Sequence, residues 1–339
     1  MNKILRGLAP VLAAATALSP ALAADEAAVL KTPAQVVAAA PQADWKPIAP
    51  SDLLVMDLAP DGDDEPRRVV IQLMPAPFSQ GWVENIRKLA AAHWFDGIAV
   101  VRVQDNYVVQ WGDPESENPD KAKPLPEGLK VMPESDYVVK TGPVELKGKM
   151  EVVGLFKKEA GNAKDELLAI LPAFVKDGFP VLPGFKKGWP VAVQLAEQDE
   201  STIWPVHCYG SVGVGRNVSP DTGTGAELYA VIGHAPRQLD RNIAVVGRVI
   251  AGIELLSSLP RGTGELGFYE TPEERTPIVS VRMGDTVPDL PAYEYLATES
   301  ASFAAYAYTR ANRKDAFYIQ PAGGVDVCNA PVPIREVKP

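Results

Sequence analysis

The sequence predicts a mainly β protein with one principal domain and further additions. Two pairs of segments indicate the β class: 51–58 and 68–73 alternate around an acidic turn, and 100–103 and 108–111 flank a polar Gln-Asp-Asn stretch. Two such runs around a short polar turn predict a hairpin. A third observation is length, because 339 residues exceed one compact module and leave room for additions to a core domain.

The first 23 residues have the features of a secretory signal peptide. Two basic residues precede an apolar run from Leu8, and the small residues at 21–23 suit cleavage by a signal peptidase. The alternative is a membrane anchor, but the run is shorter than the roughly 20 residues needed to span a bilayer, and two prolines interrupt it. We therefore expect a cleaved signal peptide over 1–23 and a periplasmic or secreted product without a membrane span.

Residues 24–50 are rich in alanine and proline, and we interpret them mostly as a linker. The segment could contain a short helix over 32–40, with Trp45 as an anchor. A longer helix is predicted over 84–92, where apolar residues recur at helical spacing on one face that can cap a sheet.

The second hairpin carries a candidate site. Alternation would place Val100 and Arg102 on one face, and strand pairing would add Val108 and Gln110 to it. The arginine would present five fixed donors beside an amide, which suits binding a carbonyl or a backbone amide. No nucleophile or general base stands beside it, so the pattern favours non-covalent chemistry.

Arg102, Gln110, Gly112 and Asp113 match a signature that runs Phe-His-Arg, a short turn, Phe-Met and Gln-Gly-Gly-Asp. The other matching blocks, in the same order and spacing, are 68–73, 83–89, 94–97, 225–232 and 239–249. In these segments the chain resembles the cyclophilins, a family of peptidyl-prolyl isomerases.

The resemblance implies a closed, mostly antiparallel barrel of about eight strands capped by two helices, over residues 51–290. The chain between the signature and the next matching block is far longer than the family requires, so 114–203 is predicted to be an insertion. Within it, 165–175 has a helical apolar stripe that Pro172 should kink. That helix could gate the groove or dock a partner, but we favour simple packing on the barrel.

The same resemblance implies that the protein isomerises X-Pro bonds by stabilising the twisted imide, with Arg102 as the catalytic residue. The residues implied to bind the substrate are Tyr107, Val108, Gln110, Glu227, Tyr229 and Leu239. Gln110 would hold a neighbouring backbone group, Glu227 stands where the family has a glutamine, and the others would form the proline pocket. The implied partners are proline-containing polypeptides, and no cofactor is required.

Several positions depart from the family pattern. Val101 replaces a histidine beside the arginine, Gln238 a tryptophan common in drug-binding members, and Ile243 a histidine in the substrate groove. We therefore expect low sensitivity to cyclosporin. The alternative function is a catalytically weak, protein-binding module of the cell envelope, but the retained Arg102 and Gln110 favour the enzyme. A ligand inside the barrel is disfavoured, because side chains fill a barrel of eight strands.

Composition excludes several other functions. With 43 acidic against 33 basic residues the net charge is −10, which disfavours nucleic acid and anionic lipid as partners. His93, His207 and His234 lack metal-ligand spacing and there is no Cys-x-x-Cys, so we expect no metal and interpret the histidines as structural. We also expect a monomer.

The C-terminal extension, 291–339, should contain an amphipathic helix over 300–312 that packs on the rest of the protein. Cys208 and Cys328 are the only cysteines, and an even count in an oxidising compartment is compatible with one disulfide that ties this tail to the main domain. Two unpaired buried thiols are the alternative, and we favour the disulfide. Closing so long a loop could contribute about 4 kcal/mol in the chain-entropy model.

Overall fold

The computed structural model describes residues 31–62, 65–141, 144–147, 151–154, 166–168, 175–179, 182–195 and 200–338. The predicted signal peptide lies outside these residues. No helix in the described part of the chain is long and apolar enough to cross a bilayer.

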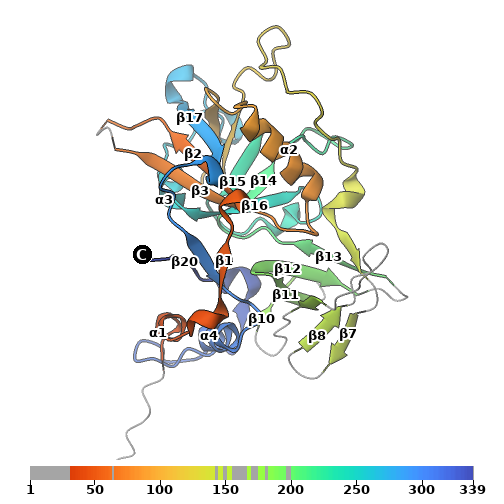
Figure 1. The fold of residues 1–339 in the computed structure, drawn as a ribbon, viewed down its shortest axis with the longest axis vertical. Helices are drawn as coiled ribbons and strands as arrows, with labels where there is room; N and C mark the ends of the chain where they lie inside the picture. The colour runs from red at the N-terminus through yellow and green to blue at the C-terminus, as the bar shows by residue number, and fades with distance from the viewer. Residues whose placement is uncertain are drawn as a thin grey trace, which may run out of the picture. The chain divides into compact units, whose positions relative to one another are not determined.

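Eight antiparallel strands close into a barrel, as predicted, in the order β14-β15-β5-β4-β17-β2-β3-β16. Figure 1 labels six of them, β2, β3, β14, β15, β16 and β17. Their bounds are β2 (Leu53–Leu58), β3 (Arg67–Leu73), β4 (Ala99–Val103), β5 (Val108–Gly112), β14 (Ser211–Val214), β15 (Leu228–Val231), β16 (Val245–Ala251) and β17 (Thr276–Met283). Both predicted hairpins, β2 with β3 and β4 with β5, are present.

The barrel strands contribute to one large apolar core. Met56, Val69, Val109 and Ala230 come from four different strands and are fully buried in it. Burial of a large aliphatic side chain stabilises a fold by roughly 1.5 to 3 kcal/mol. The barrel is therefore a rigid support for side chains on its outer face.

Two helices pack against the barrel. In α2 (Gln80–Ala91) the buried residues Trp82, Ile86 and Leu89 share one face, and the helix contacts β16 and β17 (Figure 1). It begins four residues before the predicted start. The short α3 (Ile253–Ser257) contacts β3.

The insertion forms sheets of its own. One is a four-stranded sheet in the order β11-β12-β13-β6, with bounds β6 (Val139–Thr141), β11 (Leu182–Lys186), β12 (Trp189–Gln194) and β13 (Ser201–Pro205). The other is the three-stranded sheet of β7 (Val144–Lys147), β8 (Glu151–Gly154) and β9 (Glu166–Leu168).

The helix predicted over 165–175 is wrong where the structure describes it. Residues 166–168 form β9, which pairs antiparallel with β8, and β10 (Val175–Lys176) pairs with β19 (Val325–Asp326). A short apolar run does not distinguish a helix from a strand by its period, and here the neighbouring strand decides. The predicted kink at Pro172 lies outside the described residues.

The N-terminal segment and the C-terminal extension are packed together. A three-stranded sheet has the order β1 (Trp45–Ile48), β18 (Tyr293–Leu296) and β20 (Ile334–Glu336), and α1 (Pro33–Ala38) contacts α4 (Ala301–Ala311). The helix predicted over 300–312 is confirmed. Where the sequence indicated mostly a linker, the structure has α1, β1 and a buried Trp45.

Short 3₁₀ turns complete the fold. They are η1 (Gln42–Asp44), η2 (Pro50–Asp52), η3 (Glu134–Tyr137), η4 (Arg237–Leu239), η5 (Glu265–Gly267), η6 (Pro272–Glu274), η7 (Gly284–Thr286) and η8 (Val327–Asn329). A disulfide joins Cys208, which precedes β14, to Cys328 in η8, the favoured of the two alternatives. It ties the extension to the barrel across 120 positions of the sequence.

Candidate active site

A β-bulge in β4 turns Arg102 to the outer face of the barrel. Val100 pairs with Trp111 and Arg102 with Gln110, so Val101 is an extra residue in the strand. Val100 is fully buried in the core, whereas Arg102 is only half-buried. The prediction that Val100 and Arg102 share a face is therefore wrong, because it assumed uninterrupted alternation.

Arg102 is held by three hydrogen bonds. Its Nε donates to the Leu266 carbonyl at 2.7 Å, Nη1 donates to Gln110 Oε1 at 3.0 Å, and Nη2 donates to Gln104 Oε1. Burial lowers the pKa of Arg102, but the group remains a cation at neutral pH. A guanidinium has five N–H groups, so two remain without a partner among the described residues.

An aromatic pair flanks this guanidinium. The Arg102 Cζ atom lies 5.6 Å from the centroid of the Tyr107 ring and 5.1 Å from that of Phe268. Phe268 also forms an isolated antiparallel β-bridge with Arg102 through the backbone. Leu266, two residues earlier, has a positive φ of 55°. Sequence reasoning missed segment 265–268, where the sequence offers only two apolar residues among glycines.

All seven residues that the sequence indicated line one small cavity of about 120 Å³. They are Arg102, Tyr107, Val108, Gln110, Glu227, Tyr229 and Leu239, from β4, the β4–β5 turn, β5, the segment leading into β15, β15 and η4. Val108, Tyr229 and Leu239 belong to an apolar cluster separate from the barrel core. The cavity therefore has an apolar wall and a polar wall.

Glu227 completes the polar wall. Gln110 Nε2 donates to Glu227 Oε1, so the Gln110 amide is oriented with its oxygen toward Arg102. Gly215 makes room for this carboxyl group, because a side chain there would overlap it. Burial raises the pKa of Glu227, while the Gln110 hydrogen bond and the nearby Arg102 oppose that change. The three polar side chains thus form one hydrogen-bonded row.

The family model described as cyclophilin type peptidyl-prolyl cis-trans isomerase/CLD matches residues 67–283, from β3 to the end of β17. The chain belongs to this cyclophilin family. It is therefore of the peptidyl-prolyl cis-trans isomerase class. The match covers the residues around the cavity and spans the insertion.

A solved structure with a TM-score above 0.5 supports the fold. A crystal structure of a cyclophilin from Hirschia baltica is 21% identical with a TM-score of 0.58, and the alignment covers 92% of this chain and 100% of that one. A cyclophilin type peptidyl-prolyl cis-trans isomerase from Cryptosporidium parvum, crystallised in the presence of the dipeptide Ala-Pro, is 11% identical. Its TM-score is 0.34, with 68% of this chain and 98% of that one covered. Among curated proteins, no sequence matches.

Glu227→Gln is expected to remove a pH-dependent loss of stability from this cyclophilin. Because the folded pKa is raised, the carboxyl's contribution to the free energy of unfolding is fully present below the unfolded pKa, about 4.3, and declines as pH rises toward the folded pKa. Glutamine does not titrate, so the free energy of unfolding of the variant should fall less than that of the parent between about pH 4 and pH 7. Urea titrations at both pH values measure the difference.

The control for that comparison is Glu254→Gln, at an exposed glutamate of α3 that is not among the charges that shift the pKa of Glu227. If the free energies of unfolding of Glu227→Gln and the parent differ by the same amount at every pH, the pKa of Glu227 is not raised in the folded protein.

A buried network lies behind the apolar wall of the cyclophilin groove. The Tyr229 hydroxyl is 2.8 Å from His207 Nε2, and His207 Nδ1 is 3.0 Å from Asp240 Oδ1. Arg237 Nε donates to Asp240 Oδ2 at 2.7 Å, and Arg237 also pairs with Asp177 of the insertion. Burial raises the pKa of Tyr229 well above its usual value, so its hydroxyl stays protonated. The Asp240 carboxylate accepts from the His207 Nδ1–H group, which leaves Nε2 of the neutral ring to accept from that hydroxyl. His207 is fully buried, and both of its ring nitrogens have hydrogen-bond partners.

Tyr229→Phe is expected to lower the free energy of unfolding by about 1 to 3 kcal/mol, because it leaves a buried histidine nitrogen without a donor. The ring that lines the groove stays, so isomerase activity should change little. Tyr107→Phe is the matched control, since that hydroxyl bonds to none of the described residues, and its effect should stay within about 0.5 kcal/mol. If denaturant titrations give the same free energy of unfolding for the two variants, the hydrogen bond between Tyr229 and His207 does not stabilise the fold.

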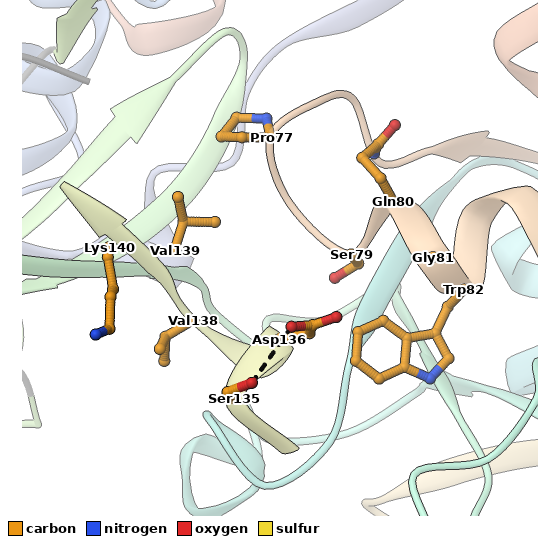
Figure 2. A pocket seen from close by; sticks show the side chains of 10 residues that line it. All are labelled: Pro77, Ser79, Gln80, Gly81, Trp82, Ser135, Asp136, Val138, Val139 and Lys140. Atoms are coloured by element: carbon orange, nitrogen blue, oxygen red, sulfur yellow. Dashed lines mark hydrogen bonds between the residues drawn. The ribbon is translucent and has the colours of Figure 1, made fainter. Parts of the chain in front are cut away.

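A larger cavity of about 450 Å³ lies between the start of α2 and the segment of η3 and β6 (Figure 2). Ser79 and Asp136 face this space, whereas Lys140 points away from it and pairs with Glu200 at 3.1 Å. Ser135 Oγ donates to Asp136 Oδ1 at 3.4 Å. None of the seven predicted site residues lines it, so the smaller cavity around Arg102 is the candidate active site.

Proposed function

We propose that the protein isomerises X-Pro bonds of exported polypeptides, with Arg102 as the catalytic residue. The observation that carries the proposal is the position of this guanidinium. It lies half-buried on a barrel strand, has two N–H groups without partners among the described residues, and borders the cavity that all seven predicted residues line.

Rotation about a peptide bond breaks amide resonance and costs about 18 to 20 kcal/mol. In the twisted state the proline nitrogen becomes pyramidal, and its lone pair becomes a hydrogen-bond acceptor that neither planar isomer offers. A donor aimed at that nitrogen binds the transition state more tightly than either ground state. Arg102 supplies such donors from a rigid strand, and no bond is formed or broken.

The neighbouring residues would position the substrate. Val108, Tyr229 and Leu239 offer an apolar surface for the proline ring. Gln110 would hold a backbone amide or carbonyl of the substrate, and Glu227 fixes the orientation of that amide. Proline-containing polypeptides are therefore the proposed partners.

A protease-coupled isomerisation assay on the purified protein tests the proposal. A protease that cleaves only the trans form of a proline peptide reports the rate at which the cis form converts. We expect the protein to accelerate this slow phase in proportion to its concentration. An unchanged slow phase at concentrations that bind the peptide would refute the proposed activity.

A second candidate is a binding module that holds proline-containing segments without turnover. One observation favours it: three of the Arg102 N–H groups already bond to Leu266, Gln110 and Gln104. Those bonds would have to yield if the substrate needs the same hydrogens. Binding of a proline peptide without acceleration in the coupled assay would select this function.

Export to the periplasm or the medium is part of the proposal. The features of residues 1–23 support it, and so does the Cys208–Cys328 disulfide, because disulfides persist mainly in oxidising compartments. N-terminal sequencing of the protein from fractionated cells tests it. We expect a mature start near Ala24, and an intact N-terminus in the cytosolic fraction would exclude export.

A further inference from the structure

A second apolar cavity, of about 230 Å³, lies behind the disulfide. Its wall includes the β11–β12 hairpin, β16 of the barrel and the C-terminal extension, with Phe185, Val206, Val249, Val327 and the Cys208–Cys328 bridge among the lining groups. It shares no lining residue with the groove around Arg102. The two cavities can therefore bind different molecules.

One charged side chain lines this cavity. Arg248 Nε and Nη2 donate to Gln72 Oε1 at 2.9 and 2.7 Å, and Nη1 donates to the Gly188 carbonyl at 2.7 Å. Among the described residues it has no carboxylate partner. Burial lowers the pKa of Arg248 to about 9, the direction expected of a cation without a nearby anion. Two of its N–H groups bond to no described residue.

A second donor on the same wall lacks a partner. Trp189 is 2% exposed, and its Nε1–H group is buried without a hydrogen-bond partner in the described structure. The Arg248 Cζ atom lies 4.3 Å from the centroid of the Trp189 ring, so the guanidinium lies over the ring that carries this donor. A buried donor left without an acceptor costs about 1 to 3 kcal/mol. The wall therefore favours a ligand that accepts hydrogen bonds and carries negative charge.

We propose that this cavity binds a small monocarboxylate, whose carboxyl group is held by Arg248 and Trp189 and whose apolar body contacts the surrounding aliphatic and aromatic side chains. A carboxylate oxygen accepts from a guanidinium and an indole with charge-assisted hydrogen bonds. The volume is below the roughly 300–1,000 Å³ typical of drug-sized ligands, so the ligand is about as large as hexanoate or benzoate. The apolar lining disfavours phosphate and sugars, which need polar contacts all round.

Calorimetric titration of the full mature protein with hexanoate tests the site. We expect a single site with a Kd below about 1 mM, and no measurable binding of hexanamide, which has the same body but no charge. In ¹H–¹⁵N spectra the Trp189 indole resonance should shift with hexanoate and not with hexanamide. Equal binding of the two compounds, or no binding of either, would overturn the proposal.

Two matched variants separate the site from a general effect on folding. Trp189→Phe keeps an aromatic ring beside Arg248 but removes the donor, and it should weaken hexanoate binding by roughly 10- to 100-fold. Trp204→Phe is the control. Like Trp189, Trp204 has a buried Nε1–H group without a partner among the described residues, and the Arg241 Cζ atom lies 4.7 Å from the centroid of its ring. Unlike Trp189, it does not line the cavity.

Trp204→Phe should bind hexanoate like the parent, and both variants should retain isomerase activity because neither residue lines the groove. If both variants bind hexanoate more weakly than the parent by the same factor, the proposed site is wrong. The result does not depend on the proposed function, since binding is measured without a proline substrate.

Discussion

Arg102→Ala is expected to lower kcat/KM for a proline peptide by two to three orders of magnitude and to leave the fold intact. This loss corresponds to roughly 3 to 4 kcal/mol, the scale measured when one oriented donor to a developing acceptor is removed. The side chain is half-buried on the outer face and lies outside the barrel core, so its removal should cost little stability. The protease-coupled assay and a thermal melt measure the two effects separately.

The matched control is Arg68→Ala, on β3 of the same barrel. Arg68 pairs with Asp57 at 2.8 Å, with 44% of its side chain exposed, and a surface ion pair of this kind contributes about 0 to 1 kcal/mol. The Arg68→Ala variant should therefore have the same kcat/KM as the parent. If Arg102→Ala isomerises the peptide as fast as the parent, the guanidinium has no catalytic role and the binding module becomes the better explanation.

Loss of the disulfide should have the largest effect on stability. Closing a loop of 120 positions removes entropy from the unfolded chain worth about 4 to 5 kcal/mol in the chain-entropy model. For a protein of this size we expect Cys208→Ser with Cys328→Ser to lower the Tm by roughly 6 to 8 °C. Calorimetry of parent and variant measures the change.

Reducing agent supplies the control for that experiment. It should lower the Tm of the parent to that of the double variant and leave the variant itself unchanged. A parent that melts at the same temperature with and without reductant, and then shows two free thiols, would mean that the bridge does not form in the folded protein.

The two hairpins were predictable from local patterns, whereas the closed barrel and the groove were predictable from the resemblance to the cyclophilins. Alternation identified β2, β3, β4 and β5, and the resemblance to the cyclophilins implied all seven groove residues. The bulge at Val101 was not predictable, because one extra residue in a run of valines leaves the alternating pattern intact. Yet this bulge decides which side chains face the groove.

Features that depend on distant partners were also missed. Leu266 and Phe268 reach Arg102 from more than 160 positions away, and neither has a distinctive local motif. The link from Tyr229 through His207, Asp240 and Arg237 to Asp177 of the insertion joins segments that no short pattern connects. In the insertion, pairing with β8 outweighs the helical spacing that 165–175 displays.

The sheet of β1, β18 and β20 has a consequence for how the protein is made. Its first strand, Trp45–Ile48, pairs with Tyr293–Leu296, which in turn pairs with Ile334–Glu336. While the ribosome is still synthesising the last residues, Trp45 has no complete sheet to join. A chain truncated before residue 334 would lack β20 and leave the hydrogen-bonding edge of the central strand β18 unpaired, so this sheet joins segments from both ends of the described chain.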